Sequence, residues 1–183
     1  APEGSAILMS LVVRDAGAAY PLLPLATALA VSEACEAHAP VDCAIKWPND
    51  VWIERRKVAG ILLEGRPQEG WAVIGIGLNV TTVEDDFPEE LRHTATSLVS
   101  EGADDVDNEE VLASVVERLD VWLGARPGDV IDAWTYRDAL LGDRIRWNGG
   151  EGVAAGIDES GALLVDTDGG RVALDAGEVH LLR

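Results

Sequence analysis

Lysine is scarce in this sequence, and both lysines fall within one window of twelve residues. Lys46 and Lys57 are the only lysines among fourteen basic residues, and Asp50 lies between them, directly after Asn49. Because the chain uses arginine elsewhere, these two positions favour a compact ammonium over a planar guanidinium. Ammonium groups can bind anionic oxygens, while the carboxylate and the carboxamide can orient hydroxyls, amines or a metal-bound phosphate. With Asn79 at the end of a later apolar run, these residues indicate a small-molecule site of unspecified chemistry.

Glycines accompany these polar residues. Gly60 follows Lys57, and Gly75 and Gly77 interrupt the apolar run that ends at Asn79. A glycine removes a side chain where a ligand could lie against the backbone. The Gly-Ile-Gly pattern could equally serve tight sheet packing. It is not a dinucleotide fingerprint, because the third glycine and the following helix are both missing.

Each polar residue also has an ordinary structural explanation. Asp50, after Pro48 and Asn49, could be a turn residue. Lys57, beside two arginines, could be a solvated charge in a hairpin turn, and two lysines in one window could be chance. Local chemistry leaves these alternatives open.

The elements that must position these residues are strands joined by tight turns. Apolar runs predict strands over residues 5–13, 43–46, 51–53, 58–63 and 71–80, and an alanine-rich run predicts a buried helix over 22–38. A polar turn, 47–50, follows the second strand, and residues 54–57 are expected to be the hairpin turn between the third and fourth strands. The continuously apolar run 71–80 is typical of a central strand.

The second half of the chain has a different texture. Residues 81–108 are acidic and irregular, which predicts a surface loop with one helical turn. Asn108 is expected to cap an amphipathic helix that Gly124 ends, and a second helix is expected over 129–141. From Gly142 onward, short β-like runs separated by turn signals predict a small five-stranded barrel.

Composition excludes several classes of protein. Thirty-three acidic residues against fourteen basic ones give a formal charge of −19 and a pI near 4.3. Such a surface repels phosphate backbones, so we expect no nucleic-acid binding by this segment. An acidic, lysine-poor surface suits a protein dissolved in concentrated salt, which makes a halophilic source a hypothesis.

Targeting signals and metal-binding patterns are also missing from the sequence. It has no apolar stretch of membrane-spanning length and no signal-peptide pattern, so we expect a cytoplasmic protein without membrane contact. Cys35 and Cys43 lack the partners of a zinc site. They are expected to be reduced thiols in the core, and no bound structural metal is expected.

Three blocks of the sequence resemble, in order and spacing, the signature of biotin protein ligases. They are Lys46-Trp-Pro-Asn-Asp, Arg56-Lys-Val-Ala-Gly-Ile-Leu-Leu-Glu and Ile74-Gly-Ile-Gly-Leu-Asn-Val. Residues 2–10, the Thr96-Ser-Leu triplet and the C-terminal residues 177–183 are similar to further segments of that family. The resemblance therefore extends over nearly the whole chain.

The resemblance implies an α+β fold in two domains. Residues 1–141 would form a catalytic core with a mixed sheet, related to class II aminoacyl-tRNA synthetases, and residues 142–183 an SH3-like β-barrel. It also implies an ATP-dependent ligase that forms biotinyl-5′-AMP and transfers biotin to a lysine of a biotin carboxyl carrier protein. Biotin and ATP, with Mg²⁺ as the counter-ion of the phosphates, would be its small-molecule substrates.

Roles for individual residues also follow from the resemblance. Lys57 and Asp50 are the expected catalytic residues, with Lys57 touching the biotin carboxylate or the bridging phosphate oxygen. The residues expected to bind biotin are Lys57, Gly60, Leu62, Gly75 and Gly77. The residues expected to bind ATP are Lys46, Asn49, Asp50 and Asn79.

One departure from the family pattern concerns the start of the sequence. The family places a glycine- and arginine-rich loop, which closes over biotin, shortly before the position equivalent to Ala1. We therefore expect the loop to be absent and these 183 residues alone not to catalyse adenylation. Three other functions stay open: a lipoate or octanoate ligase, a non-catalytic biotin sensor, and a carrier-docking module. Relatives include monomers and dimers, and the strand from Trp71 could offer a sheet edge for a homodimer.

Overall fold

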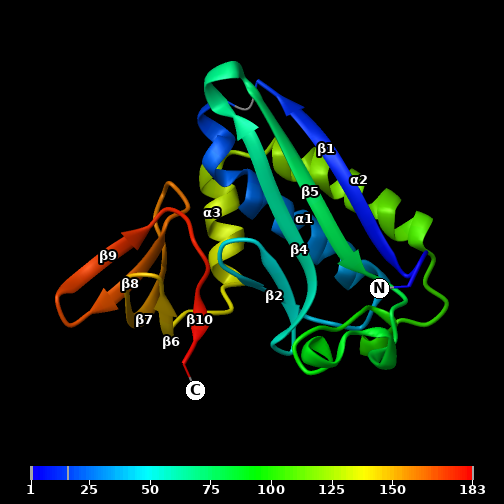
Figure 1. Cartoon of the computed structure of the whole chain (residues 1–183). Coiled ribbons are helices and arrows are strands. Elements are labelled where there is room, and N and C mark those ends of the chain that lie inside the picture. Colours follow the sequence, from blue (N-terminus) through cyan, green and yellow to red (C-terminus); the bar gives the residue numbers. More distant parts are fainter. Residues whose placement is uncertain (1, 16, 183) are drawn as a thin grey trace.

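The computed structural model describes residues 2–15 and 17–182; the expectations for Ala1 and Arg183 lie outside these ranges. Two five-stranded sheets and three α-helices organise this part of the chain (Figure 1). The first sheet contains β1 (Ala6–Arg14), β2 (Cys43–Lys46), β3 (Asp50–Ile53), β4 (Arg56–Arg66) and β5 (Trp71–Asn79). The helices are α1 (Leu23–His38), α2 (Asn108–Leu123) and α3 (Pro127–Tyr136). The second sheet contains β6 (Arg144–Trp147), β7 (Gly150–Ile157), β8 (Leu163–Thr167), β9 (Gly170–Leu174) and β10 (His180–Leu181).

The first sheet has the order β1-β5-β4-β3-β2, and its described strand pairs are all antiparallel. Short turns connect β2 to β3, β3 to β4 and β4 to β5, and such turns can join only antiparallel neighbours. The expected α+β class is confirmed, but the expectation of a mixed sheet is wrong for these strands. The prediction that 71–80 is a central strand is confirmed, because β5 lies between β1 and β4. For the same reason β5 offers no edge for a homodimer; the edges are β1 and β2.

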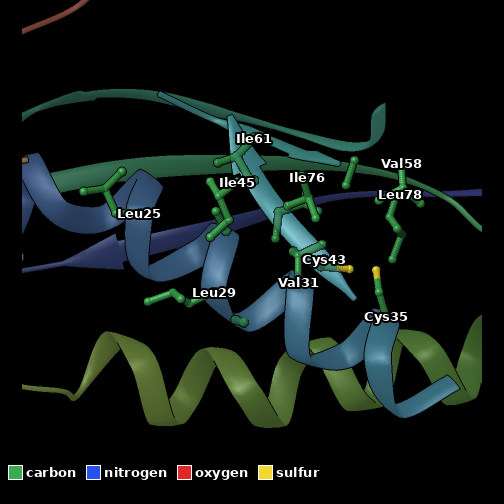
Figure 2. Close-up of a cluster of buried hydrophobic side chains, with 14 of the residues drawn as sticks. Leu25, Leu29, Val31, Cys35, Cys43, Ile45, Val58, Ile61, Ile76 and Leu78 are labelled. Carbon is green, nitrogen blue, oxygen red and sulfur yellow. The ribbon is translucent and has the colours of Figure 1, made fainter. Parts of the chain in front are cut away.

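Helix α1 lies between the first sheet and α2, as Figures 1 and 2 show. Its side chains are buried almost all the way around, including Leu25, Leu29 and Val31. A helix covered on two sides needs apolar residues on both, which explains the alanine-rich run. The sheet contributes Ile45, Ile61 and other inward-pointing side chains to the same core.

Cys35 of α1 and Cys43 of β2 are buried free thiols, as predicted. Their sulfur atoms point toward each other in the core (Figure 2). The hydrogen bond with Cys43 and the burial of the side chain raise the pKa of Cys35 well above its ordinary value. The two cysteines therefore act as small core residues.

The second sheet has the order β10-β6-β7-β8-β9 and is also antiparallel. It lies beside α3 at one side of the molecule (Figure 1). The Trp47 side chain, which is buried in the first core, connects the two parts, because its Nε1 donates a hydrogen bond to the Gly161 carbonyl at 3.0 Å. The turn after β2 is thereby held against the loop between β7 and β8.

Several predicted boundaries differ from the structure. The N-cap of α2 is Asp107, whose carboxylate accepts hydrogen bonds from two backbone N–H groups of the first turn, and not Asn108. Helix α3 starts at Pro127, where a missing N–H costs nothing, and it ends at Tyr136. Residues 81–108 contain three short 3₁₀ helices where one helical turn was expected: η3 (Glu84–Asp86), η4 (Glu89–Leu91) and η5 (Val99–Glu101). In the described part of the chain, no helix has the length and apolarity needed to cross a bilayer.

The first prediction concerns the sandwiched position of α1. Leu29→Ala is expected to lower the free energy of unfolding by about 2–5 kcal/mol, because the fully buried side chain leaves a cavity between sheet and helix. Leu141→Ala is the matched control, because this leucine is 59% exposed, and its effect should stay within about 0.5 kcal/mol. Urea denaturation followed by circular dichroism measures both. Equal effects of the two substitutions would contradict the described core.

Candidate active site

The outer face of the first sheet carries rows of aligned residues across three strands. Gly77 of β5 pairs with Leu8 of β1 on one side and with Gly60 of β4 on the other. In the next row, Gly75 pairs with Ser10 and with Leu62 by the same register. Side chains alternate between the two faces of a strand, so these rows face away from α1. The exposed fractions of 85% for Leu8 and 59% for Leu62 agree with that placement.

A groove of about 460 Å³ lies on this face. Its lining residues are Leu8, Met9, Ser10, Asn49, Lys57, Gly60, Ile61, Leu62, Gly75, Ile76 and Gly77. A Cβ atom at Gly75 would meet the Leu62 Cβ at 3.6 Å, and one at Gly77 would meet the Leu8 Cδ2 at 3.5 Å, both ordinary contacts. The packing of the chain itself therefore does not require glycine at these two positions. Their effect is an open floor, which favours the ligand explanation over tight sheet packing.

Gly60 is different, because a side chain there would collide with Lys57. A Cβ atom at Gly60 would lie 2.8 Å from the Lys57 Nζ and 2.9 Å from its Cε. Real Cβ atoms essentially never come so close. Gly60 therefore allows the lysine side chain to lie along its own strand.

The Asp50 carboxylate lies between both lysines. Its Oδ1 is 2.5 Å from the Lys57 Nζ, and its Oδ2 is 3.9 Å from the Lys46 Nζ. The Lys46 ammonium also lies 5.5 Å from the centre of the Trp52 ring, at cation–π distance. The side chains of Lys46 and Asp50 are 13% and 16% exposed, whereas that of Lys57 is 45% exposed. Asp50 thus pairs with the largely covered ammonium of Lys46 and with the half-exposed ammonium of Lys57, which can still meet a ligand.

The strand register explains this cluster. Asp50, the first residue of β3, pairs with Lys46 of β2 and with Gly60 of β4. Lys57 was expected in the hairpin turn, but the turn consists of Glu54 and Arg55, both with positive φ, and Lys57 lies within β4. The explanation of Lys57 as a merely solvated turn charge is therefore wrong, and so is that of Asp50 as a simple turn residue.

The two asparagines have different surroundings. Asn49 lines the groove, and its Nδ2 donates a hydrogen bond to the Ile61 carbonyl at 2.5 Å. Asn79, at the end of β5, does not line the described groove. Its Nδ2 donates to the Thr96 carbonyl at 3.0 Å, which ties the end of β5 to the loop that follows. The structure thus brings all the predicted residues except Asn79 into the groove or the ion cluster beside it.

Residues 2–10 and the Thr96-Ser-Leu triplet resembled family segments, but no role in the site was predicted for β1 or for the loop around Thr96. Leu8, Met9 and Ser10 form one wall of the groove because β1 pairs with β5, far along the chain. Such a distant pairing leaves no local signal except the strand pattern itself. Within the described residues, no group of three or more His, Cys, Asp or Glu side chains could hold a metal ion.

Two family models together match most of the chain. The model of the biotin/lipoate A/B protein ligase family matches residues 12–135, and that of the biotin protein ligase C-terminal domain matches residues 141–182. The chain belongs to the biotin protein ligase family.

Individual relatives agree with this assignment. The chain is 34% identical to the bifunctional ligase/repressor BirA of Bacillus spizizenii, over 98% of the chain and 59% of the relative. It is 35% identical to the biotin–[acetyl-CoA-carboxylase] ligase of Mycobacterium tuberculosis, over 90% of the chain and 64% of the relative. The chain thus spans about six tenths of the length of these curated relatives.

Solved structures of the family have the same fold. The biotin protein ligase of Aquifex aeolicus superposes with a TM-score of 0.87 at 29% identity, over 97% of this chain and 83% of that one. The same Aquifex protein in complex with biotin and ATP gives a TM-score of 0.84 at 28% identity, over 98% of this chain and 79% of that one.

The second prediction compares two glycines of the groove. Gly77→Ala should raise the free energy of unfolding by about 0.5–1 kcal/mol, because alanine loses less backbone entropy and its Cβ meets only an ordinary contact. Gly60→Ala should leave the free energy of unfolding unchanged or lower it by about 1 kcal/mol, because the new methyl group displaces Lys57 from Asp50. Denaturant titrations at neutral pH measure the difference. If both variants are stabilised equally, the described position of the Lys57 side chain is wrong.

Proposed function

We propose that this chain provides the active site of an ATP-dependent biotin protein ligase. The observation that carries the proposal is the glycine-floored groove with the Lys57 ammonium at its edge, anchored by Asp50. An apolar floor suits the ring system of biotin, and a fixed cation suits its carboxylate. The names of the Mycobacterium relative and of the Aquifex complex with biotin and ATP support the same substrates.

In the first reaction, a carboxylate oxygen of biotin attacks the α-phosphorus of ATP. The new bond to phosphorus forms as the bond to pyrophosphate breaks, which leaves biotinyl-5′-AMP. Negative charge gathers between the carboxylate and the α-phosphate, beside the expected position of the Lys57 Nζ. Because Asp50 and Gly60 fix this ammonium before the substrates arrive, little reorganisation is needed in the transition state. Gly60, Leu62, Gly75 and Gly77 would contact biotin.

The nucleotide end of the site is assigned to Lys46, Asn49, Asp50 and Asn79. Magnesium binds through one or two carboxylates together with substrate phosphates, and Asp50 is suited to that role. The residues beside the groove form no dedicated metal cage of their own. The ion would therefore arrive with ATP and shield its phosphates.

In the second reaction, a lysine amine of a biotin carboxyl carrier domain attacks the acyl carbon of the adenylate, and AMP leaves. This step needs mainly positioning and a neutral amine, since the mixed anhydride is already activated. The exposed side of the groove leaves room for such a lysine.

The finer features of the fold belong to the same proposal. We assign residues 2–141 to a catalytic core of class II synthetase type and residues 142–182 to an SH3-like barrel, supported by the change of sheet after α3. A homodimer would use the free edge of β1, because residues 137–139 already cover the outer edge of β2 through backbone hydrogen bonds with Ile45. Cytoplasmic location and a salt-rich cytoplasm remain predictions from composition.

The third prediction tests the ligase function itself. The chain, and any longer product of its gene, is incubated with biotin, ATP and magnesium at low and at molar salt, and biotinyl-5′-AMP is measured by mass spectrometry. Lys57→Ala should reduce adenylate formation about 10²–10³-fold, because the fixed positive charge is lost. Arg55→Ala is the matched control, since this cation of the same hairpin is paired with Asp143 away from the groove. It should change the rate less than about twofold.

The competing functions predict other results. A lipoate or octanoate ligase would give the corresponding acyl-adenylate and no biotinyl-5′-AMP. A silent sensor or a carrier-docking module would give no adenylate with any acid, although the protein is folded. Either result from the longest product of the gene, at both salt concentrations, would contradict the proposal, whereas inactivity of the 183 residues alone is already expected.

A further inference from the structure

We infer that Glu101 is a positioning residue that holds Lys57 and Asn79 in their places from outside the groove. The inference rests on the proposed function, which assigns these two residues to biotin and to ATP. Glu101 lies on η5, about twenty residues along the chain from Asn79, and does not line the groove.

The first step is the edge of β4 at Lys57. Strand β5 pairs with β4 only from Ala59 onward, so the start of β4 has no partner from β5. The loop segment 94–96 fills that place as a short parallel bridge. The Lys57 N–H donates to the Thr94 carbonyl at 2.8 Å, and the Thr96 N–H donates to the Lys57 carbonyl at 2.9 Å. The backbone of Lys57 is therefore held by the loop on this side.

The second step is the connection to Asn79. The Asn79 carboxamide donates to the Thr96 carbonyl at 3.0 Å, and the Asn79 carbonyl accepts from the Leu98 N–H at 3.3 Å. Thr96 thus contacts both predicted ligand residues through its backbone. Any movement of Thr96 would shift both of them.

The third step is what fixes Thr96. Its hydroxyl donates to the Glu101 Oε1 at 2.5 Å, and the same oxygen accepts from the Arg56 Nη2 at 2.6 Å. The Glu101 side chain is only 10% exposed, and Thr96 is almost fully buried. This carboxylate is costly to disturb, because the buried Thr96 hydroxyl would be left without a partner. Glu101 therefore clamps the loop to the first residue of β4, directly before Lys57.

The chemistry of this clamp requires a carboxylate. A single Oε1 that accepts from a guanidinium and a hydroxyl must be a strong acceptor, and charge-assisted hydrogen bonds supply that strength. In Glu101→Gln the amide oxygen can take the position of Oε1, but it carries no charge and is a weaker acceptor for both the Arg56 guanidinium and the Thr96 hydroxyl. The loop should then loosen at Thr96 without any change in the groove lining.

The fourth prediction tests this inference with the protein form that is active in the adenylation assay. Glu101→Gln should lower kcat about tenfold and raise the KM for ATP about tenfold, since small misplacements of binding groups affect both parameters. Hydrogen exchange of the Lys57 amide, followed by NMR, should accelerate about tenfold as its bond to Thr94 opens more often. Thr96→Val, which removes only the hydroxyl donor, should shift the same three quantities in the same direction.

The matched control is Glu36→Gln. Glu36 also pairs with an arginine, Arg137, and accepts a hydrogen bond from the Cys43 backbone N–H. These contacts join α1 to β2 and to the residue after α3, away from Lys57. This control should lower the melting temperature and leave kcat, the KM for ATP and the Lys57 amide exchange within twofold of the wild type. It separates a general loss of stability from a loss of positioning.

The outcomes distinguish the two proposals. Suppose that the wild type is active and that Glu101→Gln and Thr96→Val behave like Glu36→Gln in kinetics and in amide exchange. The positioning role is then overturned, and the proposed function is not affected. If Glu101→Gln does not fold, Thr96→Val decides by the same measurements. A wild type that forms no adenylate refutes the proposed function, and unchanged exchange of the Lys57 amide in the variants then refutes the clamp as well.

Discussion

The position of the Lys57 ammonium depends on a carboxylate on the neighbouring strand and on a missing side chain on its own strand. Asp50 attracts the ammonium across the β3–β4 pairing, and Gly60 leaves the space through which the lysine reaches it. A slip of one residue in this register would turn the side chains of one strand to the opposite face and would separate the pair. The register of a single hairpin therefore sets the charge distribution of the site.

The same sheet has two faces with opposite functions. Its inner face packs on α1 with large aliphatic side chains, of which Ile61, Ile74 and Ile76 are almost fully buried. Its outer face carries glycines at the alternating positions of β5, and the groove lies over them. Because α1 is held between the sheet and α2, the floor of the groove has a rigid support. The outer face can therefore lack large side chains without loss of the fold, since the apolar side chains of the inner face are the ones that are buried.

Local patterns in the sequence predicted most of the strands that carry the site. The predicted strand 43–46 agrees with the structure, and the predicted turn 47–50 and central strand 71–80 each differ from it by one residue at the end, because side-chain periodicity and turn residues are local signals. The glycines and lysines of the site were indicated by residue type and by family resemblance. What the sequence could not provide was pairing between distant segments, such as β1 beside β5 or the loop 94–96 beside β4. The mistaken edge position of β5 has the same origin, because an edge is defined by the neighbours that a strand lacks.

The two adjacent residues Arg56 and Lys57 show how this acidic chain divides its cations. Arg56 turns its guanidinium to Glu101 and holds the loop, whereas Lys57 turns its ammonium to Asp50 at the groove. Elsewhere arginines pair with acids at the surface, and hydrogen bonds from Arg126 and Arg171 lower the pKa values of Asp129 and Asp166. Carboxylates with lowered pKa values contribute stability above their ordinary pKa that is lost as the pH falls through the lowered pKa. The fork of arginine suits such fixed pairs, and a compact ammonium suits a site where oxygens of substrate and protein must exchange places. Both lysines of this sequence lie at the proposed site.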